Sequence, residues 1–193
     1  MQNFQEFLEN SLQQNIKKLV PLTGGASADI NRIILENNNE LIVRRSLSKE
    51  QSVMAVPKKL EAKIQRIVRS NDAPVPEIIF EFSENEDIGE GYVMEAIPGE
   101  TIPRKILRDD KYKNVRSKLS FEIGRSLATI HQTKLDELTD LDSVTFEESL
   151  KKLYLVYSSF EQPQPVFELA FKWLETQELT KYDDVLVLSL IHI

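Results

Sequence analysis

One apolar run near the middle of the sequence constrains the fold more than any other feature. Residues 91–97 read Gly-Tyr-Val-Met-Glu-Ala-Ile, and Pro98 and Gly99 follow directly. The run predicts a buried strand, and the Pro-Gly pair predicts a turn at its end. Upstream of this turn the pattern mixes strands and helices, whereas downstream it is mainly helical. We therefore expect an α+β fold with a hinge here, although the run alone also fits an ordinary strand and turn.

The composition limits the classes of function. The chain has 193 residues and a formal net charge of -7, so we expect no surface dominated by contacts to nucleic-acid phosphates. It has no cysteine and two histidines, which excludes disulfides and thiolate metal sites and argues against a histidine-rich zinc site. No apolar run approaches the roughly 18 residues of a membrane-spanning helix, and the N-terminus does not resemble a signal peptide. We expect a cytoplasmic protein without membrane contacts.

The N-terminal segment shows helical periodicity. Its apolar residues recur at three- and four-residue spacing, and they are Phe4, Phe7, Leu8, Leu12, Ile16 and Leu19. This spacing predicts one amphipathic helix. The polar face mixes acids, amides and lysines, which favours packing on the chain's own domain over binding to a membrane or a partner.

Three short strands and a loop of small residues are predicted next. The strands cover residues 20–22, 30–35 and 41–45. The loop between the first two strands contains the small residues Gly24, Gly25, Ala26 and Ser27. Glycines let backbone N–H groups approach a phosphate closely, but the Gly-Lys-Ser/Thr of a P-loop is absent. The pattern fits both a phosphate-binding loop and a plain hairpin loop.

A glutamate on the next helix and two arginines on the third strand are candidates for an ion pair. The helix opens at Val56-Pro57, and its apolar stripe consists of Leu60, Ile64, Ile67 and Val68. Glu61 lies beside this stripe, where its carboxylate can reach a cation on the sheet. Arg44 and Arg45 are adjacent on a strand and point to opposite faces, so only one of them can meet Glu61. The alternative is that all three are solvated surface residues.

One more strand is predicted before the hinge, and several helices after it. The strand covers residues 77–82. Helices are expected at residues 102–107, 115–131, 146–157 and 165–177, and a final strand is expected to begin at Asp184. His131 ends the second of these helices, and we expect it to cap that helix or join the core rather than act in catalysis.

Seven segments occur in an order and spacing that carry a family resemblance. They are residues 22–27, 41–45, Glu61 in its helix, and residues 73–76, 91–95, 98–100 and 124–131. Together they resemble the aminoglycoside phosphotransferase family, in particular its branch related to the kinase domain of certain acyl-CoA dehydrogenases. The resemblance implies a protein-kinase-like two-lobed fold. The small lobe would be complete, with an antiparallel sheet and helices, and the large lobe would be mainly helical and truncated.

The resemblance implies a phosphate site in the small lobe. The loop from Gly24 to Ser27 would cover the phosphates of ATP. Arg44 would take the place of the usual strand lysine, which holds the α- and β-phosphates and pairs with Glu61. Because arginine presents a planar fork and lysine a point charge, this replacement changes how phosphate is held. We expect Arg44 and Glu61 to face each other across the helix–strand interface.

The resemblance also implies an adenine site at the strand that precedes the hinge. Met94 would line this site, and Glu95, Ala96 and Ile97 would offer backbone groups to the base. The implied cofactors are ATP and Mg2+. The implied partners are the nucleotide and a small-molecule acceptor that carries a hydroxyl group.

The chain departs from the family pattern in its last residues. The family places its catalytic aspartate in a His-Gly-Asp loop and its metal ligands at a following asparagine and a later aspartate, and the sequence contains no His-Gly-Asp. Residues 185–187 resemble the strand that leads into that loop. Residues 188–193 read Leu-Ser-Leu-Ile-His-Ile, which matches one translation of a transposon-end adapter used in sequencing libraries. The alternative is a natural apolar C-terminal strand.

These observations predict an inactive N-terminal fragment of a small-molecule kinase. We expect a nucleotide-binding lobe at residues 1–97, a partial helical lobe at 98–187 and an adapter-derived tail at 188–193, with no catalytic residue and no metal ligand. Apolar helix faces left uncovered would make it a poor folding unit. The parent would transfer the γ-phosphoryl group of ATP to a hydroxyacyl or aminoglycoside-like compound. The alternatives are a non-catalytic pseudokinase, acting as a nucleotide-binding or interaction module, and a purely structural domain.

Overall fold

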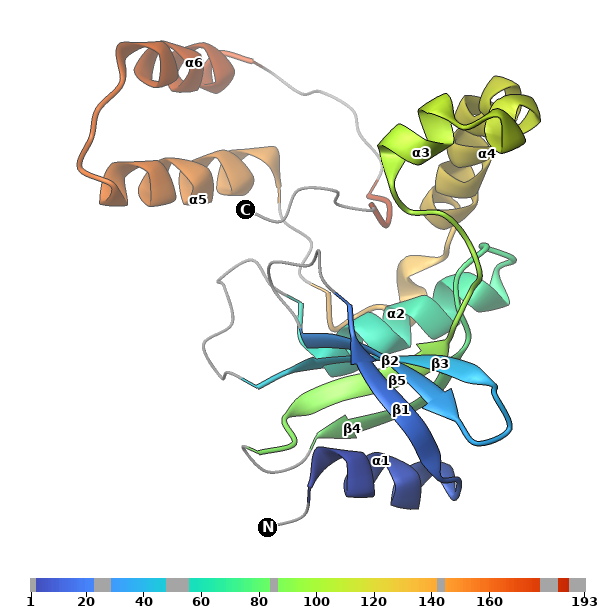
Figure 1. The fold of residues 1–193 in the computed structure, drawn as a ribbon. Coiled ribbons are helices and arrows are strands. Elements are labelled where there is room, and N and C mark those ends of the chain that lie inside the picture. Colours follow the sequence, from blue (N-terminus) through green and yellow to red (C-terminus); the bar gives the residue numbers. More distant parts are fainter. Residues whose placement is uncertain are drawn as a thin grey trace. The chain divides into compact units, whose positions relative to one another are not determined.

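The computed structural model describes residues 3–22, 29–47, 56–83, 87–141, 145–177 and 184–187 (Figure 1). The chain divides into two compact units, one that runs to Glu137 and one that covers Leu138–Val185. The predicted small-residue loop, with Gly24, Gly25, Ala26 and Ser27, lies outside the described residues, as does the tail at 188–193. The lobe boundary at residue 97 stays a prediction.

A five-stranded antiparallel sheet forms the centre of the first unit, which confirms the α+β class. Its strands are β1 (Ile16–Pro21), β2 (Asp29–Leu35), β3 (Glu40–Ser46), β4 (Ile78–Ser83) and β5 (Glu90–Glu95). They lie in the order β1-β2-β3-β5-β4. The strand predicted before the hinge is β5, which pairs with β3 on one side and β4 on the other. This interior position buries both sets of its side chains between helices that cover the two faces.

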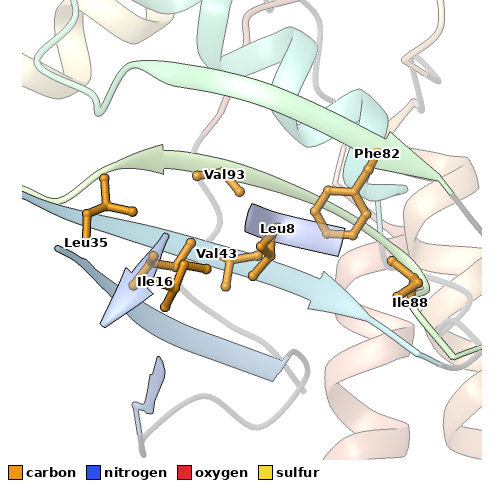
Figure 2. Close-up of a cluster of buried hydrophobic side chains, with 8 residues drawn as sticks. Leu8, Ile16, Leu35, Val43, Phe82, Ile88 and Val93 are labelled. Atoms are coloured by element: carbon orange, nitrogen blue, oxygen red, sulfur yellow. The ribbon is translucent and has the colours of Figure 1, made fainter. Parts of the chain in front are cut away.

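Helix α1 (Phe4–Leu12) covers one face of the sheet. Leu8 is fully buried there against side chains from all five strands and the β4–β5 turn (Figure 2). The other buried members of this cluster are Ile16, Ile33, Leu35, Val43, Phe82, Ile88 and Val93. Phe7 meets the Phe82 ring edge-on, with centroids 5.2 Å apart. The N-terminal helix is therefore part of the core of the first unit, as its mixed polar face predicts.

The single long N-terminal helix predicted from the apolar spacing is wrong in its length. The helix ends at Leu12, and β1 begins at Ile16. Gln13 adopts the left-handed conformation (φ 53°), and its N–H donates to the carbonyl of Glu9. The N–H of Ile16 donates to the Glu9 carboxylate at 3.0 Å. The backbone thus turns from α1 into β1, and Ile16 at the start of β1 joins the same buried cluster as Leu8. The apolar residues after Leu12 therefore keep a helix-like spacing although they are not helical.

Helix α2 (Lys58–Ser70) covers the opposite face of the sheet (Figure 1). Ala62 is fully buried and packs with Ile78 and Tyr92, and Met94 lies against this cluster. A small residue at this position lets the helix backbone lie close to the sheet. The close approach brings polar side chains of the first helical turns over the end of β3.

Helices follow residues 98–99, as predicted. The first unit continues with α3 (Pro103–Arg108), a 3-10 turn (Asp110–Tyr112), α4 (Lys113–His131) and a second 3-10 turn (Leu135–Glu137). Arg116 ties α4 to the segment before it, because its Nη1 donates to the carbonyls of Ile106 at 3.1 Å and Asp109 at 3.0 Å.

The second unit consists of α5 (Phe146–Ser159) and α6 (Pro165–Glu175). Thr145 and Glu148 form a capping box at the start of α5, which satisfies backbone donors that the first helical turn leaves free. The two helices meet through aromatic rings, and Phe171 lies edge-on to Tyr154 with centroids 5.0 Å apart.

The strand predicted from Asp184 is wrong for the residues that the structure describes. Residues 184–187 have no regular secondary structure, since no strand of the described sheet pairs with them. A strand exists only through its hydrogen-bonded neighbours, and a short apolar run cannot supply them by itself. In the described segments, no helix is long and apolar enough to cross a membrane.

Candidate functional site

An ion pair joins strand β3 to helix α2, at the place that the sequence predicts. The Nε atom of Arg44 lies 3.1 Å from Oε2 of Glu61, and the two side chains are 19% and 24% exposed. Arg44 faces α2 because it lies directly across from Tyr92 on β5, and side chains of cross-strand partners share a face. The choice between the two adjacent arginines therefore falls on Arg44.

Two further side chains reach the same carboxylate. The Nζ atom of Lys58 lies 2.6 Å from Oε1 of Glu61, and the hydroxyl of Tyr92 lies 3.2 Å from Oε2. Both oxygens of Glu61 thus accept hydrogen bonds, and the donors come from α2, β3 and β5. Sequence reasoning missed Lys58 and Tyr92. A signal for Lys58 was present, because a lysine three residues before a glutamate on a helix shares its face.

The electrostatics of this cluster keep Glu61 ionised. Burial raises the pKa of Glu61, but the hydrogen bond from Lys58 and the charges of Arg44 and Lys58 lower it by more. The resulting pKa lies below the usual 4.5. Burial, followed by the negative charge of Glu61, raises the pKa of Tyr92 well above its usual value, so Tyr92 stays a neutral donor.

Arg45 turns to the other face of the sheet and has a different set of partners. Its Nε lies 2.8 Å from Oδ2 of Asp29, and its guanidinium stacks 3.5 Å above the ring centroid of Phe4. Nη1 also donates to the carbonyl of Ile88 at 3.3 Å. The side chain is 12% exposed, so the alternative of a solvated surface arginine is wrong for Arg45. It joins α1, β2 and the turn before β5.

Gly91 allows β5 to pack closely against β3, the strand that carries Arg44 and Arg45. It lies opposite Arg45, and a Cβ added there would come within 2.5 Å of the Arg44 carbonyl and 2.6 Å of the Phe82 ring. Any larger residue would push apart the two strands that hold both arginines. The glycine at the start of the predicted hinge strand is therefore required by packing.

The residues predicted to bind adenine lie at the C-terminal end of β5 and directly after it. Met94 is half-buried on the α2 face, and its sulfur lies 3.8 Å from Nε2 of Gln65. The N–H of Glu95 donates to the carbonyl of Glu77 at 2.9 Å, so this donor is already used in the sheet. Within the described part of the chain, no backbone hydrogen bond engages the N–H groups of Ala96 and Ile97.

The segment with the predicted phosphate loop leaves and re-enters the sheet beside the arginines. The N–H of Leu22 donates to the carbonyl of Ile30 at 2.8 Å, and Ile30 lies across from Arg44 in the β2–β3 ladder. The intervening Gly24, Gly25, Ala26 and Ser27 lie outside the described residues, and their role stays a prediction. The two described ends of the loop are next to the strand position that holds Arg44.

The described residues offer no ready metal site. No group of three or more histidine, aspartate or glutamate side chains among them is arranged to hold a metal ion. The Arg44–Lys58–Glu61–Tyr92 cluster contains a single carboxylate, which is already occupied by two cations and a hydroxyl. Its surplus of donors suits an anion.

The fold is that of a kinase-like phosphotransferase of known structure. The chain is similar in structure to the crystal structure of a Ralstonia eutropha JMP134 protein assigned as an aminoglycoside phosphotransferase, with a TM-score of 0.63 and 17% sequence identity. The alignment covers 87% of this chain and 51% of that one, so this chain spans about half the length of the structure it matches. At this identity the likeness shows the fold alone.

The sequence places the chain in a family. Residues 18–188 match the model of the phosphotransferase enzyme family, and the chain therefore belongs to that family. Among proteins with curated functions, none matches it. The family and the kinase-like α+β fold confirm the resemblance that the sequence segments carry.

Proposed function

We propose that this chain supplies the nucleotide-binding lobe of an ATP-dependent phosphotransferase. The observation that carries the proposal is the half-buried Arg44–Glu61 pair between β3 and α2, in a chain that belongs to the phosphotransferase enzyme family. In such enzymes a strand cation held by a helix glutamate positions the phosphates for transfer. The small-molecule acceptor would receive the γ-phosphoryl group on a hydroxyl.

The geometry of Arg44 supports a role in phosphate binding. Arg44 donates to Glu61 through Nε only, as far as the described residues go. The two Nη groups form the end of a planar fork that suits the oxygens of a phosphate. Glu61 therefore fixes the arginine from behind without using the donors that would face a ligand.

The hinge supports adenine recognition. The N–H of Glu95 is used in the sheet, so Ala96 and Ile97 are the stronger candidates for donating to the base. Met94 lies on the same face as Arg44 and would line the pocket beside them. The adenine and the phosphates would thus lie along one face of the sheet, from the end of β5 toward β3.

Chemistry beyond nucleotide binding needs residues that this sequence does not contain. The sequence has no His-Gly-Asp, and the matched structure is about twice as long as the aligned region. We propose that the catalytic aspartate and the ligands of Mg2+ belong to a longer parent protein, which works in the cytoplasm on a hydroxyacyl or aminoglycoside-like acceptor. When bound, Mg2+ would neutralise charge on the phosphates.

The first test is ATP binding by calorimetry. Replacing Arg44 by alanine removes a charge-assisted contact worth roughly 1.5–3 kcal/mol, so we expect ATP affinity to fall by about 10- to 100-fold. Arg32→Ala is the matched control, because Arg32 lies on the same face of the neighbouring strand but is 44% exposed and pairs with Glu40. Unchanged ATP affinity in Arg44→Ala would refute the assignment.

A non-catalytic pseudokinase is the second candidate. The missing His-Gly-Asp favours it for the 193-residue chain as it stands. Incubation with ATP, Mg2+ and hydroxylated acceptors separates the two candidates. Phosphorylated acceptor formed by the parent protein but not by this chain supports the kinase proposal, whereas ATP binding without transfer by both supports the pseudokinase.

A further inference from the structure

Lys58 occupies a position where a lysine is unfavourable on two counts. Its side chain is only 7% exposed, and burying an ammonium group costs free energy. It is also the first residue of the 13-residue helix α2, whose N-terminal end carries a partial positive charge. Burial and the helix dipole both disfavour a cation here. Sites that break local rules in this way are often functional.

Among the residues that the structure describes, the contacts of the Lys58 side chain supply a single carboxylate, which Lys58 shares with Arg44. Glu61 is the single carboxylate that Lys58 and Arg44 share, with Lys58 on Oε1 at 2.6 Å and Arg44 on Oε2 at 3.1 Å. The hydroxyl of Tyr92 adds a neutral donor. Counting Arg44 and Lys58 as +1 each and Glu61 as -1, the three charged side chains joined by these contacts carry a net charge of +1. A further carboxylate, that of Glu90, accepts from the backbone N–H of Lys59 at 2.8 Å and makes no described ion pair with Lys58 or Arg44. A net charge in a half-buried group is costly unless an anion shares it.

We propose that Lys58 is the second cation of an anion-binding site formed with Arg44 and bridged by Glu61, and that the phosphate chain of a nucleotide is its ligand. The identity of the ligand rests on the function proposed above. The two cations are complementary, because arginine offers a planar fork and lysine a compact point charge with three donors. Glu61 orients both, and the phosphate oxygens supply the missing negative charge.

A purely structural role for Lys58 makes a different prediction. If Lys58 only held Glu61 in place, any side chain that donates a hydrogen bond to Oε1 would serve. Lys58→Gln keeps an amide donor but removes the charge, whereas Lys58→Arg keeps the charge. The neighbouring Lys59 is exposed and provides a matched control as Lys59→Gln.

The experiment is calorimetric titration of the full 193-residue chain with ATP, inorganic triphosphate and adenosine. For Lys58→Gln we expect triphosphate and ATP affinity to fall at least about tenfold, with adenosine affinity unchanged. Lys58→Arg should stay within about threefold of the wild type, which is under 1 kcal/mol. Lys59→Gln should match the wild type. Lys58→Met gives a second uncharged variant, and thermal melting identifies any variant that fails to fold.

The outcomes separate this inference from the function on which it rests. Unchanged triphosphate affinity in a folded Lys58→Gln or Lys58→Met overturns the role of Lys58, even if the wild type binds ATP. Equal losses for adenosine and triphosphate also overturn it, since they indicate a general loss of structure. A wild type that binds triphosphate no more weakly than ATP, with no adenosine affinity, contradicts the nucleotide site but leaves the anion site to be judged by the Lys58 variants.

Discussion

At the scale of single residues, the candidate site converges on Glu61. Its two carboxylate oxygens accept from a lysine on its own helix, an arginine on β3 and a tyrosine on β5. Removing a carboxylate from such a group leaves two cations facing each other, which costs more than the lost hydrogen bonds alone. Glu61 therefore stabilises the fold and, through the same contacts, positions the cations of the proposed phosphate site.

The lowered pKa of Glu61 gives a prediction about stability and pH. A carboxylate whose pKa is lower in the folded state contributes stability above its unfolded pKa, and that stability is lost as the pH falls through the folded value. We expect Glu61→Gln to lower the free energy of unfolding by about 1.5–3 kcal/mol at pH 7. The difference from the wild type should shrink below about pH 4.5.

Urea denaturation between pH 7 and pH 3 measures this effect. Glu77→Gln serves as a control, because the Glu77 side chain is 61% exposed and its nearest cation lies 3.6 Å away. We expect that control to stay within about 0.5 kcal/mol of the wild type at every pH. A Glu61→Gln difference that is constant over the whole range would show that the ionised carboxylate is not what stabilises the site.

The sequence predicts some members of the site and not others, for physical reasons. Strand alternation and the helix stripe predict that only one of the two adjacent arginines can meet Glu61, and the family resemblance indicates that it is Arg44. Lys58 could have been assigned from its spacing three residues before Glu61 on the same helix, but Tyr92 could not, since its contact depends on how closely α2 approaches the sheet. The sequence does not decide whether Arg45 is solvated or packed. The structure shows that it packs against Phe4 and Asp29, which come from other elements.

At the scale of elements, β5 connects the two sides of the sheet. Its residues alternate between the α1 face, with Gly91 and Val93, and the α2 face, with Tyr92 and Met94. A change in β5 is therefore expected to disturb the core and the candidate site together. The apolar run that constrains the sequence so strongly is this strand.

Substitution of Gly91 tests that coupling. A Cβ at this position would lie 2.5 Å from the Arg44 carbonyl and 2.6 Å from the Phe82 ring, so Gly91→Ala must separate β5 from β3 or displace the ring. We expect a loss of about 1–3 kcal/mol in the free energy of unfolding. Gly99→Ala is the control, because a Cβ there meets nothing within 4 Å. Equal thermal melting of the two variants would contradict the close packing.

Helix α1 is the element whose length the sequence could not predict. Apolar spacing of three and four residues fits a helix, but it also fits a helix, a turn and a strand that feed the same core. The turn depends on the left-handed backbone conformation of Gln13, which the residue pattern does not predict. By contrast α2, α4, α5 and α6 were predicted in type and approximate extent, since each carries a sustained periodic pattern.

The contribution of α1 can be measured at Leu8, which is fully buried among side chains of the sheet. Leu8→Ala removes buried apolar volume and leaves a cavity, so we expect a loss of about 2–5 kcal/mol. Asn10→Ala, on the exposed side of the same helix, is the control and should change stability by about 0.5 kcal/mol or less. Similar unfolding midpoints for the two variants in urea would mean that α1 does not belong to the core.

At the scale of the whole molecule, the chain belongs to the phosphotransferase enzyme family and spans about half of a structure with the same fold. The fold class could be predicted from the order of strands and helices around β5. The acceptor could not, because acceptor recognition depends on side chains that no pattern in these residues specifies. The central claim of this account is therefore nucleotide binding along one face of the sheet.

Titration of the isotopically labelled chain with ATP, followed by nuclear magnetic resonance, tests that claim most directly. We predict that the largest shifts occur at the backbone amides of Ala96 and Ile97 and at the Nε–H group of Arg44. Inorganic triphosphate should move the Arg44 signal and leave the two hinge amides in place. If ATP leaves all three signals unmoved, or shifts only residues of α5 and α6, the nucleotide site is not where this account places it.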